Sequence, residues 1–383
     1  MVANAIDMIG KLVSFDTVSR HSNLELIHYV RDYLAEYGVE STLVFNDDKS
    51  KANLYATVGP KVEGGVVLSG HTDVVPVDGQ PWSTDPFTVV EKDGKLYGRG
   101  TADMKAFSAI GLSLVPEMLK KGLKKPIHFA LSYDEEVGCV GAPRMIREMA
   151  DHLPKPRAVV VGEPTNMEIV NAHKGVNGFQ TTVIGHEAHS SQVHRGVSAV
   201  MTAAKLIEFL RGIMDEFKAS ADPANGFEPP YTTVHVGVVN GGTAMNIISR
   251  ECTFVWDVRN LPWDNPKDVL AKFEAYCAEL LPEMQAIAPE CSITTVATSA
   301  APGLKPEESG AAEELCRLLS GQNSISVVPY GTEAGQFQEV GFSTVVCGPG
   351  SIDQAHQPDE FIKISQVEEG EAFLRKLIDH LAQ

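Results

Sequence analysis

Histidine and carboxylate residues stand at the ends of several apolar runs in this sequence. The run "GVVLSG" is followed by "HTD", the run "IHFALS" by "YDEE", and the run "AVVVG" by "EPT". The residues of this kind are His71, Asp73, Asp103, Glu135, Glu136, Glu163 and His356. Imidazole nitrogens and carboxylate oxygens suit zinc and related divalent cations as ligands. Two such cations activate water and polarise a carbonyl group while a free carboxylate moves the proton, so the pattern predicts metal-assisted hydrolysis.

Each of these residues alone has a simpler interpretation. Asp103 could cap the helix that follows it, and Glu163 could be an ordinary turn acid. The consecutive acids Asp134, Glu135 and Glu136 could form a solvated turn, although three adjacent negative charges at the end of an apolar strand are costly to bury. The metal site is favoured because all the motifs fall at strand ends that the pattern of elements places on one edge.

Alternating helix and strand patterns surround these motifs. Strands are expected at residues 40–46, 52–58, 65–69, 127–133, 157–161, 324–328 and 342–347. Helices are expected at residues 4–15, 23–37, 105–121 (interrupted by Pro116), 142–150, 309–320 and 366–381. This alternation predicts an α/β sheet with helices on both faces. Ligands of open α/β sheets bind at the carboxyl ends of the strands, where the histidines and carboxylates would meet.

A segment within the chain has a different order of elements. Its pattern is βαββαβ, which is the ferredoxin-like arrangement. The expected elements are a strand at 178–184, a helix at 196–217, strands at 232–239 and 249–257, a helix at 266–281 and a strand near 292–297. We therefore predict a catalytic metal-binding domain of residues 1–176 and 292–383, with an inserted lid or dimerisation domain at 177–291. The insert would leave a sheet edge open in a monomer, so we expect a homodimer.

The composition limits which partners fit. The chain has 383 residues, with 32 Lys plus Arg against 50 Asp plus Glu and a formal net charge of −18. Such an acidic protein would repel phosphate backbones, so we expect a small-molecule substrate and no nucleic acid. The six cysteines form no CxxC pair, and no signal-peptide pattern or apolar run of about 20 residues is found. These features predict a soluble cytoplasmic protein with no membrane partner.

Five motifs carry a resemblance to a known family. In chain order they are "SGHTDVVPVD", "GRGTADMK", "YDEEVG", "GEPT" and "DQAHQPDE". Together, over nearly the whole chain, they resemble the di-zinc aminoacylase and acetylornithine deacetylase family of metallopeptidase-like hydrolases. The resemblance implies a zinc-peptidase-like α/β/α catalytic domain with the ferredoxin-like insert as lid or dimerisation domain. It also implies two Zn²⁺ ions per subunit, although Co²⁺ and Mn²⁺ suit the same ligands.

The resemblance also implies a role for each catalytic-domain residue. His71 and Glu163 would ligate one ion, and Glu136 and His356 the other, with Asp103 bridging both. Asp73 would hold the imidazole of His71, and Glu135 would be the general base that activates the water. The family also tends to have a cis peptide bond after the bridging aspartate, here between Asp103 and Met104.

Three residues of the insert match further family positions. His189, in "GHEAHSSQVHRG", would reach the active site of the partner subunit and stabilise the oxyanion, although Val193 stands where the family usually has proline. Asn246 and Arg259 match positions that hold the substrate. Arg259 suits a bidentate grip on an α-carboxylate, but it could equally be a surface arginine in a salt bridge.

The stretch "YGTEAGQF" adds two expected substrate contacts. Gly331 would permit close approach of the backbone to the substrate, and Glu333 would contact the terminal ammonium of an ornithine-like side chain. Both expectations concern the specificity of the site and are independent of the metal ligands.

The implied reaction is removal of the acetyl group from N2-acetyl-L-ornithine to give L-ornithine and acetate, a step of arginine biosynthesis, by attack of a water molecule held by two zinc ions. Alternatives within the family are succinyl-diaminopimelate desuccinylase, a broad N-acyl-L-amino-acid aminoacylase and a dipeptidase. A desuccinylase should offer an extra cation, whereas "TEAGQF" offers an acid. A non-catalytic metal-binding scaffold should lack the base, the bridge or the oxyanion residue, and all three are present. No GxSxG or GxxxxGK[ST] motif supports serine-based hydrolysis or phosphate binding.

Overall fold

The apolar runs of the sequence form the central strands of a mixed sheet in a computed structural model that describes residues 4–383. The chain divides into two compact units. The first comprises the chain up to Ala172 together with Leu304–Val327 and Thr332–Gln383. The second comprises His173–Gly303 and Val328–Gly331.

The large sheet of the first unit has eight strands in the order β1-β2-β6-β3-β7-β14-β8-β13. They are β1 (Ser41–Phe45), β2 (Ala52–Val58), β3 (Val66–His71), β6 (Ile127–Ser132), β7 (Ala158–Val161), β8 (Val170–His173), β13 (Ser326–Val328) and β14 (Thr344–Val346). The neighbours β6, β3, β7 and β14 run parallel to one another. Every residue of these four strands is buried, which explains why they appear as continuous apolar runs in the sequence.

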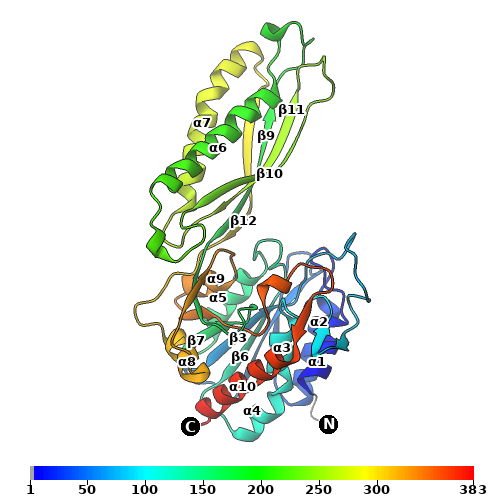
Figure 1. The fold of residues 1–383 in the computed structure, drawn as a ribbon, viewed down its shortest axis with the longest axis vertical. Coiled ribbons are helices and arrows are strands. Elements are labelled where there is room, and N and C mark those ends of the chain that lie inside the picture. The colour runs from blue at the N-terminus through cyan, green and yellow to red at the C-terminus, as the bar shows by residue number, and fades with distance from the viewer. Residues whose placement is uncertain (1–3) are drawn as a thin grey trace. The chain divides into compact units, whose positions relative to one another are not determined.

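Helices cover both faces of this sheet, as the alternating pattern predicts (Figure 1). On one face α3 packs against β3, α1 and α10, and the hydrophobic core there joins residues from all of them. On the other face α5 packs against β2, β6 and α9. The helices are α1 (Ala5–Val13), α2 (Leu24–Glu36), α3 (Lys105–Ser113), α4 (Val115–Lys121), α5 (Ala142–His152), α8 (Ala311–Ser320), α9 (Ala334–Glu339) and α10 (Ile364–Leu381).

A small sheet lies beside two of the expected metal-site loops. It has the order β15-β5-β4, formed by β4 (Val90–Lys92), β5 (Lys95–Tyr97) and β15 (Phe361–Lys363). Phe361 is paired with Tyr97 in antiparallel register. The loop that carries Asp103 begins at β5, and the loop that carries His356 ends at β15. Because β5 and β15 are paired, the two loops are anchored next to each other.

The second unit confirms the ferredoxin-like arrangement. Its elements follow the order β9 (Val176–Ile184), α6 (Ala199–Ala219), β10 (Thr233–Gly241), β11 (Glu251–Arg259), α7 (Pro266–Ile287) and β12 (Ser292–Ala301). The sheet order is β10-β11-β9-β12, all pairs are antiparallel, and α6 and α7 lie on one face (Figure 1). Alternate residues of β9 and β11 face the helices, and Trp256, Phe254 and Phe273 fill the core between the two layers.

Some elements differ from the sequence-based expectation. The helix expected at 105–121 is divided into α3 and α4, because Pro116 in the first turn of α4 cannot continue the preceding helix. The short elements β4, β5, β8, β15 and α9 were not expected. β12 extends to Ala301, and the second unit runs to Gly303 instead of ending at residue 291. None of the helices in residues 4–383 combines the length and the hydropathy that a membrane span requires.

Candidate metal centre

The parallel strands bring the expected ligands to one edge of the large sheet. His71 is the last residue of β3, Glu136 follows β6, and Glu163 follows β7. His356 lies in the loop after β14, just beyond the single turn Ile352–Gln354. Because β6, β3, β7 and β14 are neighbours with the same direction, their carboxyl ends meet there.

Asp103 lies between the two histidines. Its Oδ1 is 2.9 Å from Nε2 of His71, and its Oδ2 is 3.4 Å from Nε2 of His356. One oxygen therefore faces each imidazole, as a carboxylate that bridges two cations must. The peptide bond between Asp103 and Met104 is cis, as the resemblance implied.

Glu163 and Glu136 lie on either side of Asp103, each beside one of the two histidines. Oε1 of Glu163 is 3.8 Å from Nε2 of His71, and Oε2 of Glu136 is 3.0 Å from Nε2 of His356. Ligands of one zinc ion at about 2.0–2.2 Å from the metal lie roughly 3–4 Å from one another, so these separations suit shared cations. The ligand atoms of His71, Asp103 and Glu136 all lie within 4.8 Å of one another, as do those of His71, Glu135 and Glu163.

The charges of this cluster fit divalent cations. Burial raises the pKa of Glu135 to about 8 and that of Glu136 to about 7, and it raises the pKa of Glu163 well above its ordinary value. So many buried carboxyl groups can be ionised together only when positive charge lies among them. Oε1 of Glu163 is also buried without a hydrogen-bond partner in residues 4–383. A metal ligated by these imidazole and carboxylate groups would supply both the charge and the missing partner.

Asp73 supports the cluster differently from the expectation. Nδ1 of His71 donates to the backbone carbonyl of Asp73 at 2.8 Å, while the Asp73 carboxylate is 3.7 Å from that nitrogen. The carboxylate instead accepts from the backbone N–H groups of Glu135 and Glu136, at 3.1 and 3.2 Å, and from the hydroxyl of Ser19 at 2.6 Å. Asp73 therefore fixes the backbone from which the expected base and one expected ligand extend.

The first acid of the triplet has its own partner. Asp134 forms an ion pair with Lys51, whose ammonium group also donates to the carbonyl of Ser19. Its backbone has a φ of 55°, and its carbonyl accepts from the N–H of Val140. Asp134 is thus a structural residue that closes the turn after β6, and the three acids of "DEE" have three different surroundings.

Cys139 is a contact of the expected base that no sequence motif indicated. Its thiol donates to Oε1 of Glu135 at 3.1 Å and is buried. No residue between 4 and 383 donates to Oε2 of Glu135. The only signal in the sequence was that Cys139 stands four residues after the expected base, within the turn that both residues share.

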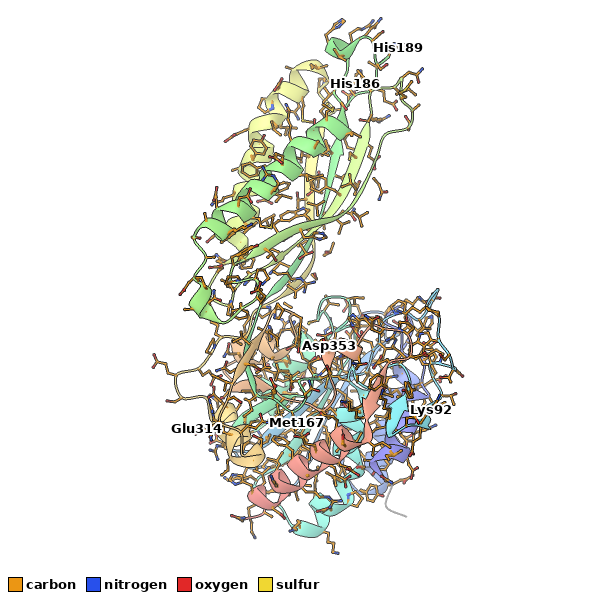
Figure 2. The ribbon with its side chains drawn as sticks, in the orientation of Figure 1. Lys92, Met167, His186, His189, Glu314 and Asp353 are labelled. Atoms are coloured by element: carbon orange, nitrogen blue, oxygen red, sulfur yellow. The ribbon has the colours of Figure 1, made fainter. Side chains whose placement is uncertain are left out.

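His189 and Asn246 lie together in the second unit. Figure 2 shows His189 and His186 at one end of that unit. His189 pairs with Ile247 through a backbone bridge, and the carbonyl of Asn246 accepts from the N–H of Ser190. Both side chains are exposed, and Nδ1 of His189 is 2.7 Å from the hydroxyl of Ser191. His186 instead pairs with Glu290.

Arg259 lies at the other end of the same sheet. It is the last residue of β11, whereas the loop that carries Asn246 joins β10 to the first residues of β11. β11 has nine residues and rises about 3.3 Å per residue, so its ends are roughly 26 Å apart. Nε of Arg259 donates to Asp257 at 3.2 Å. Within one chain, Arg259 and Asn246 are thus too far apart to bind one small substrate.

The expectation for Glu333 is wrong. Its carboxylate is buried at the start of α9, where Oε1 accepts from the hydroxyl of Ser69 at 2.5 Å and Oε2 from that of Ser132 at 2.7 Å. Ser69 lies on β3 and Ser132 is the last residue of β6, so Glu333 joins two neighbouring strands, and its buried carboxylate offers no surface to a substrate ammonium. Gly331 likewise lies close to other residues of the protein and not to an open substrate site. A Cβ there would lie 2.4 Å from the side chain of Val176 and 3.1 Å from the carbonyl of Lys174.

Replacing Glu333 by alanine should therefore affect stability and leave substrate preference unchanged. The hydroxyls of Ser69 and Ser132 would lose their buried acceptor, at a cost of about 1–3 kcal/mol in the free energy of unfolding. Urea unfolding of the metal-loaded protein measures this cost, and kcat/KM for N-acetylornithine and N-acetylmethionine measures preference. Glu339→Ala, at an exposed position of the same helix, is the control. A changed ratio between the two substrates would return Glu333 to the binding site.

Comparisons with known proteins agree with this geometry. Residues 67–380 match Peptidase family M20/M25/M40. The acetylornithine deacetylase of Pasteurella multocida (strain Pm70) is 33% identical over 384 residues, which cover 98% of each chain. That of Myxococcus xanthus is 35% identical over 380 residues, which cover 97% of this chain and 96% of the relative.

Solved structures share the fold at lower identity. An M20-family metallo-carboxypeptidase from Sulfolobus solfataricus has a TM-score of 0.77 at 19% identity and covers 99% of each chain. A dinuclear metal-binding peptidase of the M20 family from Bacillus subtilis has a TM-score of 0.64 at 16% identity, covering 98% of this chain and 97% of its own. The family match spans most of the sequence, and the resemblance read from the five motifs is confirmed: the chain belongs to peptidase family M20/M25/M40.

Proposed function

We propose that the protein is an acetylornithine deacetylase that hydrolyses N2-acetyl-L-ornithine to L-ornithine and acetate, a step of arginine biosynthesis, with two zinc ions per subunit. The observation that carries the proposal is the nearly full-length similarity to two acetylornithine deacetylases, at 33% and 35% identity. It is supported by the five expected ligands, which lie together at one edge of the sheet, and by the expected base Glu135, which lies beside them.

Each residue of the centre has a proposed task. The ions would be held by His71 and Glu163 on one side and by Glu136 and His356 on the other, with Asp103 between them. When bound, the ions polarise the acyl carbonyl and lower the pKa of water. Glu135 takes the proton from the attacking water and returns it to the leaving amine. Because the thiol of Cys139 occupies Oε1 of Glu135, Oε2 is the oxygen left to carry that proton.

A homodimer would complete the active site. Arg259 would grip the α-carboxylate in its own subunit, and His189 and Asn246 would act in the partner's, which agrees with their positions at opposite ends of β11. Large apolar side chains are exposed near His189. Met245 is 99% exposed, and Val193 and Met201 are exposed at the same end. Such a cluster suits an interface between two copies.

The substrate assignment no longer depends on Glu333, because that residue is buried. It depends on the full-length relatives, and a desuccinylase, a broad aminoacylase or a dipeptidase remains the alternative that the experiment must exclude. A cytoplasmic location is supported by the six cysteines, which are all buried free thiols.

A hydrolysis panel tests the proposal directly. The substrates are N-acetylornithine, N-succinyl-diaminopimelate, N-acetylmethionine and a set of dipeptides, with the metal content of the same sample measured by mass spectrometry. We expect the highest kcat/KM for N-acetylornithine and two zinc equivalents per chain. Chelation should abolish hydrolysis, and added zinc should restore it. A higher kcat/KM for any other substrate class would replace the assignment.

A further inference from the structure

A chain of side chains joins the backbones of two proposed ligands in the first unit. Glu360 and Arg99 are each 1% exposed and form an ion pair at 2.7 Å. Oε1 of Glu360 accepts from the backbone N–H groups of Gly100, Ala102 and Asp103, at 3.0, 2.8 and 3.1 Å. A single carboxylate oxygen thus shapes the loop that carries the bridging aspartate.

The chain continues from Arg99 to the other loop. Nη2 of Arg99 donates to Oε1 of Gln80 at 2.6 Å, and Nε2 of Gln80 donates to the backbone carbonyl of His356 at 3.0 Å. Trp82 holds Gln80 in this position, because its Nε1 donates to the same Oε1 at 3.0 Å. The ring of Trp82 also lies 5.0 Å from the guanidinium of Arg99. Gln80, Trp82, Arg99 and Glu360 form what we call the loop network.

His356 needs such support more than the other proposed ligands. His71, Asp103 and Glu163 are buried, whereas the side chain of His356 is 54% exposed and little packing fixes it. Its backbone has a φ of 63°, a left-handed conformation that residues other than glycine seldom adopt. The hydrogen bond from Gln80 fixes the direction of the carbonyl, and with it the direction in which the imidazole leaves the backbone.

We propose that the loop network positions the backbones of Asp103 and His356, and that Gln80, the member that contacts His356, sets the affinity for the ion held by Glu136 and His356. This inference rests on the two-metal centre of the proposed function. Partners that orient metal ligands typically change metal affinity about 10–100-fold when they are removed. Gln80 would act on only one of the two ions, because it contacts the backbone of His356 and none of the other ligands.

The experiment titrates the metal-free full-length protein with Co²⁺, using calorimetry and visible absorption to separate the first and second equivalents. For Gln80→Ala we expect the second equivalent to bind about 10–100-fold more weakly. The first equivalent should bind as in the parent, whereas the melting temperature of the metal-free protein should fall slightly, because Arg99 and Trp82 lose Oε1 of Gln80 as their acceptor. Trp82→Phe keeps the ring over Arg99 and removes only the hydrogen bond to Gln80, so it should weaken the second equivalent less.

The control is Gln357→Ala. Gln357 is the exposed residue next to His356, and its side chain makes no hydrogen bond within residues 4–383, so both equivalents should bind as in the parent. An unchanged second equivalent in Gln80→Ala would overturn the inference. So would a fall of both equivalents together with the melting temperature, because the network would then only hold the fold. A parental protein that binds a single equivalent would overturn the two-metal proposal and the inference with it.

Discussion

Replacing Glu135 by glutamine is expected to lower kcat for N-acetylornithine by about 10²–10⁴-fold while two metal ions stay bound. Glutamine keeps the size of the side chain and can still accept from the thiol of Cys139, but it cannot take a proton from water at neutral pH. Burial raises the pKa of Glu135 to about 8, and the positive charge of ions bound beside it would lower that pKa, so that the carboxylate is ionised and can accept the proton. Steady-state kinetics and metal analysis of the same preparation measure the two effects.

The neighbouring acid provides the matched control. Asp134→Asn changes the same functional group one residue away, but Asp134 pairs with Lys51 and does not face the centre. We expect it to lower stability and to leave kcat close to the parental value. Near-parental turnover in Glu135→Gln would exclude Glu135 as the base. Loss of metal from Glu135→Gln would instead make it a ligand, as its closeness to His71 and Glu163 allows.

The common edge of the sheet could be predicted because it depends on patterns that the sequence carries directly. Buried parallel strands appear as continuous apolar runs, and the residue after each run must lie at the carboxyl end of its strand. His71, Glu136 and Glu163 could therefore be grouped without any knowledge of their distances. The ferredoxin-like unit could also be predicted, because few folds other than the ferredoxin-like one have long elements in the order βαββαβ.

The supporting contacts could not be predicted because they join residues far apart in the chain. Glu333 stands in a motif with two glycines, and nothing in the sequence tells whether its carboxylate faces solvent or the hydroxyls of Ser69 and Ser132. The same holds for Glu360, because the motif "AHQPDE" indicates a metal ligand through its histidine and nothing in it indicates the contacts of its last acid. The sequence alone does not distinguish an acid that binds a substrate from an acid that binds backbone N–H groups.

A mixture of two inactive variants is expected to regain activity if His189 acts across the dimer. His189→Ala should lower kcat by about 10²–10³-fold, the usual effect of removing one group that stabilises an oxyanion. Its matched control is His186→Ala, since His186 is a nearby, half-buried histidine that pairs with Glu290. Co-expression of His189→Ala with Glu135→Gln from differently tagged chains lets the two variants form mixed dimers.

The expected recovery follows from the symmetry of a dimer. In a mixed dimer, the His189→Ala chain keeps its own Glu135 and receives His189 from its partner, so one of its two sites is complete. Random pairing makes about half of the dimers mixed, which gives about one quarter of parental activity. If His189 served its own subunit, every site in the mixture would lack either the base or the histidine, and no activity would return. Arg259 and Asn246 lie at opposite ends of β11, so a site that needs both requires two chains. With Arg259 acting in its own subunit, as proposed, His189 acts in the partner's, and recovery is the expected outcome.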